Sequence, residues 1–227
     1  MSDADPGSDA RGHRARLRQR LFAGPEALQD HELVEYLLAL AIPRRDTKPI
    51  ARRLLAEFGS YGRLMAADPQ ALARAGLSEG AAAALKIAEA SALRLLRSKV
   101  MARPVLASWQ ALLDYLHADM AHRPIERVRA LYLDSRNALI RDALVTEGTI
   151  DQAAVHVREV LRLALDLSSS ALILVHTHPS GDPTPSRQDI ELTREIVEAG
   201  RPLGIAVHDH VIVGADGHKS LRALGLM

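Results

Sequence analysis

Hydrophobic positions recur with two different spacings, and the change between them divides the chain in two. In the first hundred residues, apolar side chains recur three and four positions apart, the spacing of one face of an α-helix. Asp30, a residue type favoured at helix N-caps, precedes the first such run, Gly59 ends the second, and residues 81–96 form the longest. The apolar positions of the first two runs are Leu33, Val34, Leu37, Leu38, Ile50, Leu54, Leu55 and Phe58. This pattern predicts an all-helical N-terminal part.

Beyond Pro104, short apolar runs alternate with amphipathic segments. Short apolar runs are typical of buried strands, and amphipathic segments of surface helices. The predicted helices cover residues 108–120, 156–167 and 186–200, and the predicted strands cover residues 126–134, 138–146, 171–176 and 205–213. Interleaved strands and helices favour an α/β (α+β) fold, with a mixed sheet flanked by helices.

The same pattern predicts the domain organisation. Residues 1–12 are polar and without periodicity, which predicts a disordered tail. An all-helical domain is expected over residues 13–103. Pro104 follows a basic stretch and marks the predicted start of a second domain, residues 104–227.

Composition narrows the classes of function. The chain has 227 residues, a net charge of +1 and no cysteine, so disulfides and thiolate zinc sites are excluded. The same absence excludes the His/Cys/Cys site of zinc deaminases. No run approaches the ~20 apolar residues of a membrane span, and the first ten residues lack the apolar region of a signal peptide. We therefore expect a cytoplasmic protein without a membrane partner.

Positive charge is concentrated in the first hundred residues. They hold 16 Lys and Arg against 12 Asp and Glu, with the densest cluster between Arg11 and Arg20. Residues 76–81 lie between two predicted short helices and resemble the hairpin of helix-hairpin-helix modules, whose backbone amides bind DNA phosphates. Ser78 and Glu79 depart from the usual glycine pattern and bring a negative charge to the turn. Weak DNA binding and a plain helical bundle packed on the second domain both stay open.

The segment from His176 to Asp189 carries the strongest chemical signal. His176 and His178 end the apolar run 171–175, and alternate residues of a strand point to the same side. Ser186 then opens an amphipathic helix and places Asp189 in its first turn. Two imidazoles and one carboxylate form the three-ligand set of catalytic zinc, with a fourth position open for water. Prolines and a glycine restrict the intervening loop, which favours a preorganised site.

Structural interpretations of the same residues need no metal. Ser186 and Asp189 have the spacing of a helix capping box, and two histidines at a strand end can simply be partly exposed. The two interpretations of Ser186 and Asp189 are compatible, because a helix N-terminus can cap itself and also present a ligand.

The spacing H-x-H, seven residues, S, two residues, D resembles the JAMM (MPN+) metalloprotease signature, in particular its RadC-like bacterial branch. Further stretches that resemble this branch are Glu126–Asp134, Glu147–Ile150, Val155–Val160 and Asp209–Gly214. Thr177 stands where the branch usually has Asn, and residues 218–221 lack its usual aromatic residue. The resemblance is strong over residues 104–227 and weaker before them. It implies the cytidine-deaminase-like JAMM fold.

The resemblance also implies roles for individual residues. His176, His178 and Asp189 would bind Zn²⁺, and Ser186 would hydrogen-bond the tetrahedral intermediate. Glu126 would be the general base that carries a proton from water to the leaving amine; Glu147 is the alternative. Apart from the resemblance, His208 and His210 lie two positions apart in a predicted strand, and Asp209 and His210 could support a ligand imidazole or serve only the strand end.

Two functional hypotheses follow. The first is a zinc-dependent hydrolase of amide bonds, a JAMM-type peptidase or isopeptidase acting on a peptide or protein that the sequence does not identify. The second is a DNA-associated accessory protein of repair or recombination, with a structural or vestigial metal site. Nothing in the sequence predicts the oligomeric state.

Overall fold

The computed structural model describes residues 6–101, 104–148 and 155–227, with side chains from residue 12 onward. The chain forms two compact units, Met1–Ala92 and Leu93–Met227. Their division falls inside one helix, not at Pro104, because the helix has no breaker before Met101 and its end packs into the second core through Leu96 and Val100. Thr149 and Ile150, part of one stretch that resembles the family, lie outside the described residues.

The first unit is all-helical within its described residues, as predicted. Its core consists mainly of Leu and Ala side chains contributed by five helices, α2 to α6, including Leu38, Leu54, Leu72 and Leu85. Its helices are α1 (Pro6–Ala23), a 3-10 turn (Pro25–Ala27), α2 (Asp30–Ala41), α3 (Lys48–Phe58), α4 (Tyr61–Ala66), α5 (Pro69–Arg74) and α6 (Glu79–Met101). Two of these helices begin with an N-cap residue. Ser60 and Asp68, before α4 and α5, each accept a hydrogen bond from a backbone N–H in the first turn of the helix that follows.

Two sequence predictions for this unit need correction. The predicted disordered tail is too long, since α1 begins at Pro6; proline suits the first turn of a helix because its missing N–H has no partner there. Residues 1–5 lie outside the described residues. Asp30 is the first residue of α2 rather than its cap, because Gln29 and Glu32 form a capping box one position earlier.

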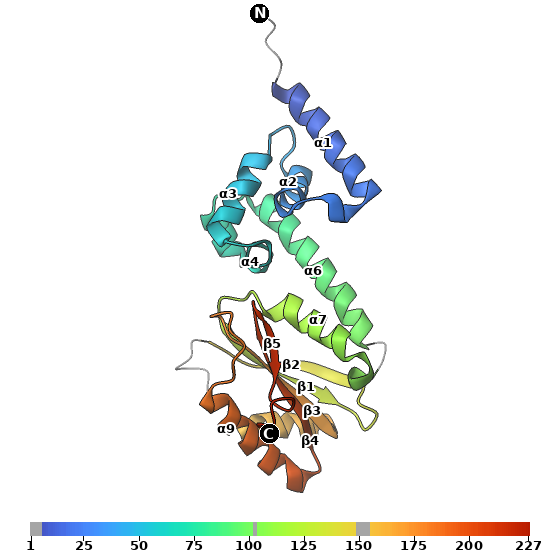
Figure 1. Cartoon of the computed structure of the whole chain (residues 1–227), viewed down its shortest axis with the longest axis vertical. Coiled ribbons are helices and arrows are strands. Elements are labelled where there is room, and N and C mark those ends of the chain that lie inside the picture. Colours follow the sequence, from blue (N-terminus) through green and yellow to red (C-terminus); the bar gives the residue numbers. More distant parts are fainter. Residues whose placement is uncertain (1–5, 102–103, 149–154) are drawn as a thin grey trace, which may run out of the picture. The chain divides into compact units, whose positions relative to one another are not determined.

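The second unit is a five-stranded mixed sheet with helices on both faces (Figure 1). The strand order is β2-β1-β3-β4-β5, and only β3 and β4 are parallel. The strands are β1 (Glu126–Leu133), β2 (Leu139–Gly148), β3 (Ala171–Thr177), β4 (Ala206–Gly214) and β5 (Gly217–Ser220). The helices are α7 (Trp109–Met120), α8 (Val157–Asp166) and α9 (Arg187–Gly200), with 3-10 turns at Val105–Ser108 and Arg201–Leu203.

Alternating side chains divide this unit into two hydrophobic layers. Leu131, Ile173 and Val211 point to the face covered by α7. Ala130, Tyr132, Leu172 and Leu174 point to the opposite face, against α8 and α9. His176 follows Leu174 by two positions, so the alternation places its ring on the α9 face. None of the helices in the described parts of the chain is both long and apolar enough to cross a membrane.

Candidate metal centre

The structure brings the three predicted ligands together at one end of the sheet. His176 Nδ1 lies 2.7 Å from Asp189 Oδ1, and His178 Nε2 lies 3.4 Å from Asp189 Oδ2. One ligand atom from each residue lies within 4.8 Å of the others, which is close enough for a single ion. His176 and Asp189 are buried and His178 is half-buried. A strand end and the first turn of a helix therefore place two imidazoles and a carboxylate around one point.

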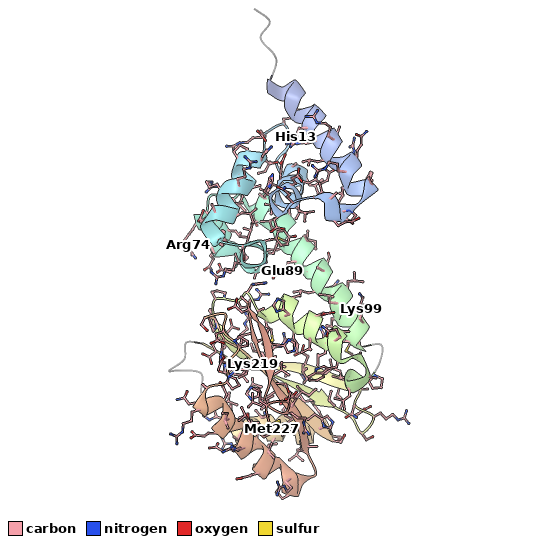
Figure 2. All side chains as sticks on the ribbon, viewed as in Figure 1. His13, Arg74, Glu89, Lys99, Lys219 and Met227 are labelled. Atoms are coloured by element: carbon pink, nitrogen blue, oxygen red, sulfur yellow. The ribbon has the colours of Figure 1, made fainter. Side chains whose placement is uncertain are left out.

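The loop between the ligands is tied to the neighbouring strands. His178 N–H donates to the carbonyl of Val213, and the carbonyl of Gly181 accepts from Asp216 N–H at 3.1 Å. Gly181 has a φ of +95°, which glycine adopts without steric cost. Lys219 of β5, labelled in Figure 2, donates to Thr184 Oγ1 at 3.1 Å. These contacts hold the loop at three of its residues, His178, Gly181 and Thr184.

Ser186 and Asp189 form the predicted capping box. Ser186 Oγ accepts from the N–H of Asp189 at 3.1 Å, and Asp189 Oδ2 accepts from the N–H of Ser186 at 2.7 Å. Ser186 Oγ also donates to Asp189 Oδ2 at 2.6 Å. The cap thus holds the carboxylate in one orientation, with its other oxygen toward His176.

Electrostatics keep this carboxylate ionised. Burial alone would raise the pKa of Asp189, but hydrogen bonds from His176, His178 and Ser186 outweigh it and hold the pKa well below its usual value. The same contact with Asp189 raises the pKa of His178, against the opposing effect of burial. The site therefore contains an ionised and already oriented carboxylate before any cation binds.

Of the two candidate bases, only Glu126 contacts the ligand group. Its carboxylate lies against His176 Nε2 and its side chain is 17% exposed. Glu147 is on the neighbouring strand and pairs with Arg127 at 2.9 Å, where it contacts neither histidine ligand. Glu126 is therefore the candidate base that lies beside the ligand group.

His210 and Thr193 form a buried pair next to His176, and the sequence predicted only the first of them near the site. The His210 ring stacks against the His176 ring, with centroids 6.0 Å apart and planes 12° from parallel. Its Nδ1 lies 2.7 Å from the hydroxyl of Thr193, and Thr193 in turn donates to the carbonyl of Asp189. One hydroxyl hydrogen serves one acceptor, so we infer that His210 donates from Nδ1. Burial, and next the charge of His176, lower the pKa of His210 to about 3, so it is neutral at pH 7.

Asp209 does not take part in this arrangement. It accepts from the His210 backbone N–H, from Ser220 Oγ and from the Arg222 N–H, and so it fixes the turn after β5. The predicted support of a ligand imidazole therefore falls to His210, through ring stacking, and Asp209 has a structural role. Only the two-residue spacing of His208 and His210 in a buried strand hinted at this, and the contact of His210 with Thr193 spans 17 residues.

Together, the mixed sheet between helices and the ligands at a strand end and a helix start define a JAB-type domain with a candidate metal centre. The chain belongs to the RadC-like JAB domain family, whose model matches residues 106–226. It is 53% identical to a UPF0758 protein of Rhodobacter capsulatus over 213 residues, which cover 93% of this chain and all of that one. It is 50% identical to a UPF0758 protein of Ruegeria pomeroyi over 219 residues, which cover 96% and 98%. The similarity thus extends through the helical unit, and neither relative's name states an activity.

Proposed function

We propose that the protein is a zinc-dependent metallohydrolase that cleaves amide bonds in a peptide or protein substrate. The observation that carries the proposal is the convergence of His176, His178 and Asp189 with Glu126 beside them. Three ligands and one uncommitted carboxylate are the parts that metal-assisted hydrolysis needs.

The donor set fits zinc in its chemistry and its orientation. His178 Nδ1 lies 2.9 Å from the carbonyl of Asp182, so this nitrogen donates, and Nε2, which faces Asp189, would give up its proton when an ion binds and serve as the ligand atom. A hydrogen bond of this kind on the outer nitrogen is what orients metal-binding imidazoles in proteins. His176 is held between two carboxylates, Asp189 at Nδ1 and Glu126 at Nε2. His176, His178 and Asp189 would hold the ion.

The remaining residues have separate tasks in the proposed reaction. When bound, zinc lowers the pKa of a coordinated water to about 7 and so makes hydroxide available at neutral pH. Glu126 accepts the proton of the attacking water and delivers it to the leaving amine nitrogen. Ser186, one residue before α9, donates its hydroxyl hydrogen to Asp189; turned toward the substrate carbonyl oxygen instead, this hydroxyl would stabilise the negative charge that develops there. His210 stays neutral behind His176 and keeps that ring in place.

A peptide-library screen tests this proposal. Zinc-loaded wild-type protein and the Asp189→Ala variant are incubated with a mixed peptide library, and mass spectrometry detects new termini. We expect cleavage only by the wild type. Equal cleavage by both proteins would assign the activity to a contaminant or to another site, and no cleavage by zinc-loaded protein across broad libraries would count against a general peptidase.

A second candidate function concerns the helical unit. A hollow of about 410 Å³ is lined by Arg45 and Arg53, by the turn Gly76–Ser78 and by apolar residues that include Ile50. Two guanidinium groups next to an apolar surface suit a nucleic-acid strand, whose phosphates pair with arginine. We propose weak DNA binding here, independent of the metal centre.

Fluorescence anisotropy with single-stranded and branched DNA tests this second function. We expect affinity that falls as salt rises and that weakens in the Arg45→Ala and Arg53→Ala variants. Arg97→Ala, a change of equal charge outside the hollow, is the matched control. Equal losses in all three variants would indicate nonspecific attraction and remove the hollow as a binding site.

A further inference from the structure

Strands β1 and β3 separate at the metal centre. Their backbone register runs from Leu133 opposite Ala171 to Val128 opposite His176, and it ends there. Past this point the chain after β3 follows β4, since His178 N–H donates to the carbonyl of Val213. Glu126 is therefore the first residue of a strand whose pairing with β3 has already ended.

A side chain continues the pairing where the backbones stop. The Arg127 N–H donates to Thr177 Oγ1 at 2.9 Å, and Thr177 Oγ1 lies 3.4 Å from the Arg127 carbonyl in a donor geometry. Thr177 is 1% exposed, so water does not compete for this contact. The hydroxyl thus takes the place of the backbone pair that the next position of the sheet would have supplied.

This bond acts on Glu126 through the backbone. The Arg127 side chain points to the opposite face from Glu126, as adjacent residues of a strand do, and pairs with Glu147. Strand β2 holds the other side of the strand start, with Gly148 opposite Glu126. The peptide that joins Glu126 to Arg127 is therefore fixed from both sides, by β2 and by the Thr177 hydroxyl.

We propose that Thr177 is a positioning residue, whose hydroxyl holds the start of β1 so that the Glu126 carboxylate stays against His176. The inference rests on the proposed function for its meaning, since Glu126 is the base in that reaction. Its geometric part does not depend on catalysis. Position 177 then requires an oxygen acceptor within reach of the Arg127 N–H, and Ser and Asn also provide one.

Hydrogen exchange and crystallography on the full-length protein test the proposal. The Thr177→Val variant keeps the β-branched shape and loses the oxygen, whereas Thr177→Ser and Thr177→Asn keep an acceptor. NMR follows exchange of the Arg127 amide, and crystal structures show the Glu126–His176 contact. Thr146→Val on β2 is the matched control, because no partner of its hydroxyl is found among the described residues. Thr177→Ala serves if Thr177→Val does not fold.

In Thr177→Val we expect exchange of the Arg127 amide to speed up roughly tenfold, as the loss of one hydrogen bond predicts. The Glu126 carboxylate should move away from His176 Nε2, so that the contact between them is lost, while the zinc content stays at the wild-type level. Ser and Asn at position 177, and the Thr146→Val control, should behave as wild type. Unchanged exchange, or faster exchange with Glu126 still against His176, would overturn the positioning role. A wild-type protein without hydrolytic activity would overturn only the proposed function, because both readouts are independent of catalysis.

Discussion

At the scale of single residues, Asp189 sets the character of the site. It accepts from two atoms of Ser186 and contacts both imidazoles while buried. A buried carboxylate without partners would take up a proton, whereas this one is held ionised by its neighbours. The same contacts orient it toward the point where the ligand atoms converge.

Glu126 and Glu147 give opposite expectations in a matched pair of variants. Glu126→Gln removes the group that moves the proton, so hydrolysis should fall by about 10²–10⁴-fold with zinc retained. Glu147→Gln removes only a contact with Arg127 and should leave both hydrolysis and zinc content near the wild-type level. Steady-state rates on a peptide from the library screen provide the measurement. A large loss in Glu147→Gln with little change in Glu126→Gln would reverse the assignment.

Thr193→Val tests the pair behind His176. The change leaves the buried His210 Nδ1 without its partner, so the free energy of unfolding should fall by about 1–3 kcal/mol. Urea denaturation with and without zinc measures it, and we expect weaker zinc binding because His210 packs on His176. An unchanged unfolding midpoint would mean that the contact between Thr193 and His210 contributes nothing to the free energy of unfolding.

The sequence alone predicted the three candidate ligands that the structure brings together, because their spacing is local: two positions along a strand, then a loop and one helical turn. Glu126 was proposed from the family resemblance and not from spacing, since 50 residues separate it from His176. His210 had only weak support and Thr193 none, because partners across a sheet and helix leave no periodic trace in the sequence.

At the scale of elements, the loop between the ligands depends on a close approach of two backbones. A Cβ placed on Gly214, at the end of β4, would lie 2.0 Å from the carbonyl oxygen of Gly181. Backbone atoms cannot move aside as a flexible side chain can, so residue 214 must be glycine for the loop to lie as it does.

Gly214→Ala should therefore displace the loop and lower the free energy of unfolding by about 1–3 kcal/mol, with weaker zinc binding. Gly80→Ala is the control, because a Cβ on Gly80 of α6 meets nothing within 4 Å. It should stabilise the protein slightly, since alanine is the better helix former by about 1 kcal/mol. Thermal melting of both variants measures the difference, and equal melting temperatures would contradict this account of the loop.

The predicted strands and helices of the second unit agree with the structure to within about two residues. Short apolar runs marked the strands, because helices cover both faces of the sheet, α7 on one and α8 and α9 on the other. The short helix α4 was not predicted, because six residues are too few to show a helical period.

At the scale of the whole molecule, two units have separate hydrophobic cores, and all candidate ligands belong to the second. The boundary was predicted at Pro104 because proline breaks helices, but the core contacts of the end of α6 decide where the units divide. Contacts between residues far apart in the chain cannot be predicted from the local pattern of apolar and polar residues.

Metal removal should consequently affect one unit only. Zinc at about 100 times its dissociation constant stabilises the folded state by about 2.7 kcal/mol, which corresponds to roughly 5–10 °C in melting temperature. We expect a chelator to lower the melting temperature of residues 93–227 by this amount, and not that of residues 1–92. Hydrogen exchange during heating resolves the two units. A chelator effect on the first unit alone would place the metal elsewhere.

The most direct test of the central claim is the zinc content of purified protein, measured by elemental analysis after metal-replete expression. The account predicts about one zinc per chain in the wild type and in Glu126→Gln, and little in His178→Ala, because three ligands hold the ion. No zinc in the wild type, or undiminished zinc in His178→Ala, would contradict the assignment of the metal centre.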